Sequence, residues 1–257
     1  MVTELKLETG TLYAFLLVLT RVSGVFVFVP LPGIKAGPDV VRAALAGSIT
    51  LALFPRWPSI AASDVSFGTL VGWMLAEAGL GIGVGIAVAY LTEIFQMGAQ
   101  IISLQAGYSF ASTIDPSSGA DSSVMLAIAQ TAAGLLFFAT GLDHQVLMAF
   151  AQSLSAHPPG QVVLNTSMLN LVIQAGSAMF STGLRLVLPL LALLLIVDMS
   201  LALLGRLNSQ LQLITLAFPI KMLVSLGLLA WLLLIFPRVF TQASGPVLRL
   251  VRQLLLG

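Results

Sequence analysis

The sequence predicts an all-α membrane protein, in which long, kinked helical hairpins flank a polar loop between central helices. Three observations predict this fold class. The 257 residues are 58% hydrophobic and only 8% charged, whereas soluble domains carry about 25% charged residues. Several apolar runs reach the length of about 20 residues that crosses a bilayer. One stretch of small and polar residues, 107–123, interrupts these runs in the middle of the chain.

The N-terminal half contains three predicted helices. Residues 11–32 form an apolar run with a single charge, Arg21, which we interpret as a retained span and not as a cleaved signal. Asp39 is a plausible N-cap for a shorter helix over residues 40–54. Residues 67–106 then form a helix too long for one simple span, so we expect it to bend or to project beyond the membrane.

Glycines at four alternate positions of this long helix give two overlapping Gly-xxx-Gly pairs, Gly79, Gly81, Gly83 and Gly85. Small residues at helical spacing let another helix approach closely. They do not match a dinucleotide fingerprint, because no strand precedes them. We therefore expect them to serve helix packing.

The C-terminal half continues the pattern of long apolar segments. Residues 124–154 are apolar with an interruption near Gly141, and residues 168–204 form one kinked helix or two. A last apolar run covers residues 211–236. The tail, residues 237–257, is amphipathic, and its arginines suggest a cytoplasmic C-terminus.

Composition and motifs exclude several classes of function. A net charge of +1 gives no nucleic-acid footprint, and the lack of cysteine excludes disulfides and thiolate metal sites. The two histidines, His144 and His157, have no ligand spacing for a metal. Neither H-E-x-x-H nor G-x-S-x-G occurs. We therefore predict a non-enzymatic protein without a cofactor or a metal.

Charged side chains stand within or at the edge of apolar runs, where a charge at the bilayer centre costs at least about 2.5–3.5 kcal/mol on insertion scales. They can form an ion or proton path, or they can pair with one another or with partner subunits. A third interpretation is that the helices lie partly outside the lipid. The positions are Arg21, Glu77, Glu93, Arg185, Asp198 and Lys221.

A polar stripe follows one face of the long helix. Glu93, Gln96, Gln100, Ser103 and Gly107 are spaced so that they fall within roughly an 80° arc at 100° per residue. Lipid would not tolerate this face, whereas a water-filled lumen or another subunit would. We predict that the stripe lines a pore or contacts a subunit.

The stretch 107–123 combines turn residues with aromatic and aliphatic side chains. Pro116 has no N–H to continue a helix, and Gly119 permits a positive φ. The stretch is either an exposed loop between helices or a re-entrant loop that lines a pore. Its candidate functional residues are Gly107, Tyr108, Ser109, Phe110, Ile114, Asp115, Pro116 and Gly119.

The central stretch from Gly98 to Ala111, followed by Asp115-Pro116 and Ser118-Gly119-Ala120, resembles the FliR family of flagellar biosynthetic proteins and its virulence type III secretion counterparts. Further likeness lies in residues 15–24, in Asp198, and in residues 203–211 and 218–221. This chain departs from the usual family pattern before the Phe-Pro pair, where it has Ser209-Gln-Leu-Gln-Leu-Ile and then Ala217.

The resemblance implies a subunit of the export gate in the bacterial inner membrane, at the flagellar basal body. It implies sister subunits FliP and FliQ, other membrane export-apparatus proteins, and exported unfolded proteins as partners. Residues 1–160 would resemble FliP and residues 161–257 would resemble FliQ. The loop 107–123 would plug a protein-conducting pore, with Glu93, Gln96 and Gln100 lining the approach to it.

Other functions fit the same sequence. A secondary transporter would use Glu77, Glu93, Arg185 and Asp198 with a helix broken at Pro189. A gate subunit of a virulence secretion system and a purely structural membrane scaffold are further alternatives. A transporter should bind a small solute as an isolated protein, whereas a gate subunit should be unstable or inert without its partners.

Overall fold

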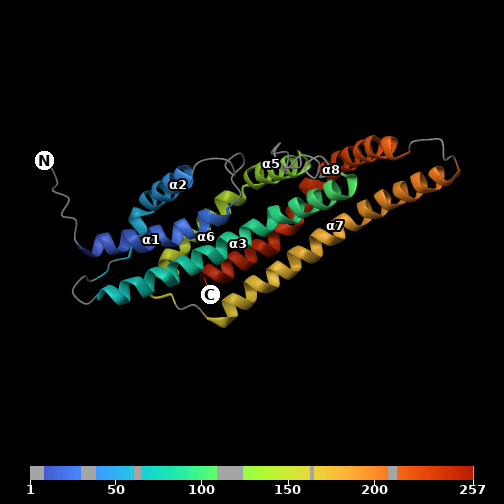
Figure 1. Cartoon of the computed structure of the whole chain (residues 1–257). Coiled ribbons are helices and arrows are strands. Elements are labelled where there is room, and N and C mark those ends of the chain that lie inside the picture. The colour runs from blue at the N-terminus through green and yellow to red at the C-terminus, as the bar shows by residue number, and fades with distance from the viewer. Residues whose placement is uncertain are drawn as a thin grey trace. The chain divides into compact units, whose positions relative to one another are not determined.

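The computed structural model describes residues 9–29, 39–58, 60, 65–108, 124–162, 165–207 and 213–256 (Figure 1). Every regular element in these ranges is a helix, which confirms the predicted all-α class. The elements are α1 (Thr9–Phe28), α2 (Asp39–Ala52), the short 3-10 helix η1 (Phe54–Arg56), α3 (Phe67–Ala106), α5 (Val124–Ala139), α6 (Leu142–Ala156), α7 (Thr166–Leu207) and α8 (Leu213–Leu256).

Four of the described helices are long and apolar enough to cross a membrane. They are α1, α3, α7 and the part of α8 from Pro219 to Leu256. The pair α5–α6 counts as a fifth span if it is taken as one helix bent by 61°. The bend lies at Gly141, whose φ of 68° is a left-handed conformation that glycine adopts without steric cost.

The chain forms two compact units. The first comprises residues 1–90, 137–176 and 244–257, and the second comprises residues 91–136 and 177–243. Both contain residues from either side of position 160. These units reflect packing alone, so the division at residue 160, expected from family resemblance, stays a prediction.

In the first unit, α1 and α3 approach each other closely through glycines. A Cβ atom on Gly24 would lie 2.9 Å from the carbonyl oxygen of Ala78, and one on Gly85 would lie 2.7 Å from that of Val25. A Cβ on Gly81 would overlap the carbonyl oxygen of Arg21. No larger side chain fits these positions without moving backbone. The packing role predicted for the glycines of α3 is therefore confirmed at Gly81 and Gly85.

The helix α2 folds back beside α1 (Figure 1). Arg42, near its start, donates a hydrogen bond of 2.7 Å to the carbonyl oxygen of Val27, near the end of α1. After α2 ends at Ala52, Trp57 donates from its ring nitrogen to the carbonyl oxygen of Thr50. The structure thus ends this helix slightly earlier than residue 54, because η1 takes over there.

The second unit has an aromatic centre. Phe95 of α3 contacts the rings of Phe236 and Phe240 of α8, and all three side chains are buried. Gly98 and Gly183 give α3 and α7 a close approach in the same unit, since a Cβ on Gly98 would lie 3.0 Å from a methyl group of Val187. This packing fixes the end of α3, from which the polar stretch 107–123 continues.

Two proline-containing segments are continuous helices. The apolar region around Pro189, expected as one kinked helix or two, is the single helix α7. The last apolar run and the amphipathic tail are likewise one helix, α8, which runs through Pro237 and Pro246. The tail is amphipathic as predicted, because Val251 and Leu255 are buried while its arginines at 249 and 252 are exposed.

Candidate functional site

The base of the polar stretch is fixed by the way in which α3 ends. Gly107 has a φ of 87°, and its N–H donates to the carbonyl oxygen of Leu104. The N–H of Tyr108 donates to the carbonyl oxygen of Ser103. This pair of bonds is a Schellman motif, in which a glycine in the left-handed region stops the helix. Gly107 therefore sets the direction in which the chain leaves α3.

Tyr108 ties this exit to a distant part of the sequence. Its phenolic O–H donates a hydrogen bond of 3.1 Å to the carbonyl oxygen of Met222 in α8, 114 residues further on. A hydrogen bond of this kind contributes about 0.5–1.5 kcal/mol. The first residues of the stretch are thus attached to α8.

One turn earlier, a carboxylate joins three helices of the second unit. Asp198 of α7 accepts a hydrogen bond of 3.0 Å from the side-chain amide of Gln105 in α3. Its other oxygen lies 2.6 Å from the ammonium of Lys221 in α8. The side chains of Lys221 and Asp198 are 18% and 33% exposed, so water screens the pair only in part.

We refer to Gln105, Tyr108, Asp198, Lys221 and Met222 as the anchor cluster. The sequence singled out three of these residues as functional candidates, but it gave no role to Gln105 or Met222. Gln105 lies outside the 80° arc of the polar stripe, and Met222 contributes a backbone carbonyl, for which a sequence carries no signal. The cluster contains no reactive nucleophile, and it can act by holding and releasing the start of the polar stretch.

The remaining candidates of the stretch lie outside the described residues. These are Ser109, Phe110, Ile114, Asp115, Pro116 and Gly119. Their predicted role as a plug therefore rests on sequence alone. The described part fixes only where the stretch begins and what holds its first residues.

The four polar residues of the predicted stripe differ in their surroundings. Gln96 and Ser103 are buried within the chain, and the amide of Gln130 in α5 donates a hydrogen bond of 2.9 Å to Gln96. Glu93 is half-buried and Gln100 is exposed. Only Glu93 and Gln100 of these four are thus open to a lumen or a partner without a rearrangement of this chain.

In the first unit, Arg21 of α1 and Glu77 of α3 form an ion pair in which both side chains are 0% exposed. The guanidinium also donates to the hydroxyl of Ser153 and to the carbonyl oxygen of His157. The second carboxylate oxygen of Glu77 accepts the N–H of Gly160 at 2.9 Å. Because both charges are paired and hydrogen-bonded, this arrangement meets the condition under which buried charges are tolerated.

Arg185 differs from the expectation of a buried charge, since it is exposed on the single chain. No group of three or more His, Asp or Glu side chains is placed to hold a metal in the part of the chain that the structure describes. The described charges are thus an internal pair in each unit, together with residues that face outward.

Comparison with known proteins places these features in a family context. The pattern of the family described as Bacterial export proteins, family 1, matches residues 12–246, which include the anchor cluster and both ion pairs. The flagellar biosynthetic protein FliR of Escherichia coli (strain K12) is 32% identical over 216 residues, covering 84% of this chain and 82% of that protein.

Two further relatives carry the same name. FliR of Caulobacter vibrioides is 26% identical over 219 residues, which cover 85% of this chain and 87% of that protein. FliR of Bacillus subtilis (strain 168) is 26% identical over 215 residues, covering 82% of this chain and 83% of that protein. The similarity therefore extends over most of the length of each chain.

Proposed function

Because this chain belongs to the bacterial export proteins, family 1, we propose that it is a subunit of the flagellar type III export gate. It sits in the bacterial inner membrane at the flagellar basal body. There it forms a pore with its sister subunits FliP and FliQ, and further membrane proteins of the export apparatus adjoin it. Unfolded flagellar proteins pass through this pore. The observation that carries the proposal is the family match over residues 12–246, together with four helices apolar enough to cross a membrane.

The loop 107–123 closes the pore in this proposal. Its support is the helix stop at Gly107, which directs a polar, proline-containing segment away from α3. Side chains such as Phe110 and Ile114 fill the lumen by contact. A segment with few regular backbone bonds can move aside when a polypeptide enters.

The anchor cluster sets how readily this loop moves. A part-exposed ion pair contributes about 0–1 kcal/mol, and each neutral hydrogen bond contributes about 0.5–1.5 kcal/mol. Contacts of this size favour the closed state by a few kcal/mol at most, so an open state of roughly 0.1–10% remains accessible. The gate can thus stay closed at rest and still open without a covalent step.

The Arg21–Glu77 pair has a different part in this account. Its complete burial favours a structural role, because neither charge is exposed to an ion path. It connects α1 and α3 to the segment from Ser153 to Gly160 and so holds the frame of the first unit. This observation favours a gate subunit over a transporter that would use Glu77 to couple an ion.

Purification from native membranes tests the proposal. An affinity-tagged chain, expressed at its natural level, should co-purify with FliP and FliQ and restore flagellar export to a strain that lacks it. The isolated chain should bind no small solute. A chain that restores export without either sister subunit, or that binds and moves a solute by itself, would contradict the assignment.

A further inference from the structure

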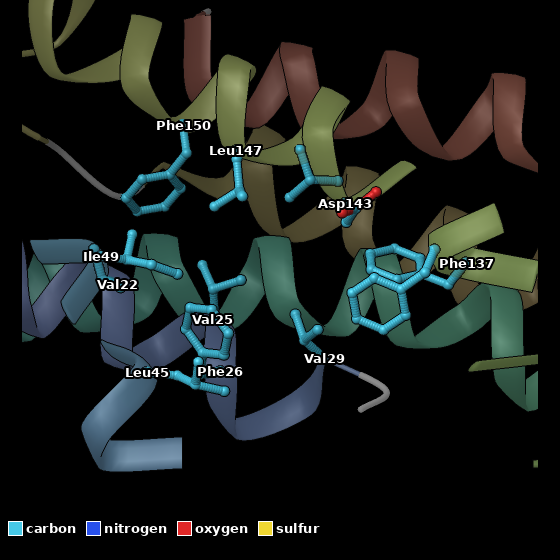
Figure 2. Close-up of a pocket in the computed structure, with 12 residues that line it drawn as sticks. Val22, Val25, Phe26, Val29, Leu45, Ile49, Phe137, Asp143, Leu147 and Phe150 are labelled. Carbon is cyan, nitrogen blue, oxygen red and sulfur yellow. The ribbon is translucent and has the colours of Figure 1, made fainter. Parts of the chain in front are cut away.

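An apolar pocket of about 240 Å³ lies in the first unit, between α1, α2, α6 and the last turn of α5 (Figure 2). Aliphatic and aromatic side chains form its walls, among them Val22, Phe26, Leu45, Ile49, Leu147 and Phe150. The proposed gate function does not use this pocket. Since α1 is apolar enough to cross a membrane, acyl chains are the natural solvent around it.

One charged side chain, Asp143, lines this pocket. It lies in the first turn of α6, and Figure 2 shows it near Phe137 and Val29, at the end of the pocket away from Ile49. Its carboxylate has no hydrogen-bond or ion-pair partner within the ranges that the structure describes. A carboxylate against an apolar wall is costly unless a donor or a cation meets it. The N-terminus of α6 supplies only part of this compensation.

A positive charge stands at the same end. Arg42 lies one turn before Leu45, which lines the pocket, and it bonds the carbonyl oxygen of Val27, two residues before the lining residue Val29. That bond uses one of the five donors of the guanidinium. The pocket therefore has an anion and a cation at one end and apolar walls beyond them.

We propose that this pocket binds a bilayer phospholipid with a primary ammonium headgroup. One acyl chain enters between Phe26, Leu147 and Phe150. The ammonium donates to Asp143, and the phosphate faces Arg42. A single headgroup carries both charges at the spacing of a few bonds, whereas a partner helix would need two side chains of opposite sign at this point.

The headgroup chemistry gives the proposal its specificity. A primary ammonium has three N–H donors for the carboxylate of Asp143, and the quaternary ammonium of a choline headgroup has none. A glycerol headgroup has no cation at all. Since hydrogen bonds to charged groups are the stronger ones, the ethanolamine lipid should bind about tenfold more tightly than either of the others.

Native mass spectrometry of the full-length chain, purified with its membrane partners and stripped of lipid, tests this inference. The probes are phosphatidylethanolamine, phosphatidylcholine and phosphatidylglycerol with identical acyl chains. We expect one ethanolamine lipid per chain to be retained in preference to the other two. Asp143→Asn should lower its retention about tenfold and leave the choline lipid unchanged. The matched control is His144→Asn, an exposed neighbour that does not line the pocket.

A second pair of variants tests the place of the acyl chain. Leu147→Trp fills the pocket and should lower retention of all three lipids, whereas Met148→Trp, on the exposed neighbour, should not. Equal retention of the three headgroups by the unaltered chain would overturn the proposal. So would a photo-crosslinker at residue 147 that captures a protein in native membranes and no lipid. Lipid retention is measured without export, so its failure leaves the gate assignment untouched.

Discussion

Lys221 of α8 and Asp198 of α7 form an ion pair of 2.6 Å, and the same carboxylate accepts a hydrogen bond from Gln105 near the end of α3. The pair is part-exposed, so it adds little to the stability of the fold. Its position gives it another use. It stands where a small change in free energy alters the attachment of the segment that begins after α3.

Asp198→Asn weakens this attachment. The amide is isosteric with the carboxylate, so folding should change by less than about 1 kcal/mol. The closed gate should leak ions about twofold to fivefold more, as measured by conductance of the assembled complex in planar bilayers. The charge-swapped pair Asp198→Lys with Lys221→Asp should return the leak toward that of the unaltered gate. An unchanged leak in Asp198→Asn would remove the ion pair from the account.

Tyr108→Phe deletes the hydroxyl that donates to Met222 and changes little else. Loss of about 1 kcal/mol corresponds to about a fivefold larger open fraction. The same conductance measurement should show this increase.

Tyr90 offers a matched control for this variant. Its hydroxyl donates to the carbonyl oxygen of Val172 at 3.3 Å in the first unit, so Tyr90→Phe loses the same kind of bond elsewhere. Tyr90→Phe should leave the leak unchanged. Equal effects of the two substitutions would show that Tyr108 has no special place in the gate.

Arg21→Met leaves the carboxylate of Glu77 buried without its partner. Removal of one member of a buried ion pair costs about 3–5 kcal/mol, so the variant should unfold at a much lower temperature or fail to accumulate in the membrane. Adding Glu77→Leu should recover much of the loss, because a buried pair can be replaced by apolar side chains. Arg252→Ala, at an exposed position, should stay within about 0.5 kcal/mol of the unaltered chain. Thermal unfolding in detergent measures all four chains, and a double variant no more stable than Arg21→Met would contradict this account.

Glu93→Leu removes the charge from the half-buried part of the polar stripe. If Glu93 lines the path of the exported chain, export should fall more than assembly does. Secretion of a reporter and recovery of the assembled complex measure the two effects. Gln174→Leu, an exposed polar residue of α7 away from the stripe, serves as the control. Loss of assembly with normal export by the surviving complex would place Glu93 at a subunit contact.

Local patterns predicted most helices correctly. The helix from Phe67 to Ala106 has the bounds expected from its apolar run and from Gly107, because the start and the stop both depend on nearby residues. The proline positions were harder to interpret. Pro189 and Pro237 lie within continuous helices, since packing along the rest of each helix outweighs the lost backbone bond.

The partners of the charges could not be predicted in the same way. Arg21 and Glu77 are 56 residues apart, and Ser153 is 132 residues from Arg21, so only the tertiary fold brings them together. Apolar context identified both charges as unusual, yet it did not distinguish an internal pair from an ion path. The same limit applies to Gln105 and Asp198, which meet across 93 residues.

The account depends most on the loop that follows the anchor cluster. Deletion of residues 110–120 from the full chain, followed by single-channel recording of the complex with its sister subunits, tests it most directly. We expect the complex to assemble and to conduct small ions at rest, while the unaltered complex stays closed. An assembled complex that lacks these residues and remains as closed as the unaltered one would contradict the assignment of the loop as the plug.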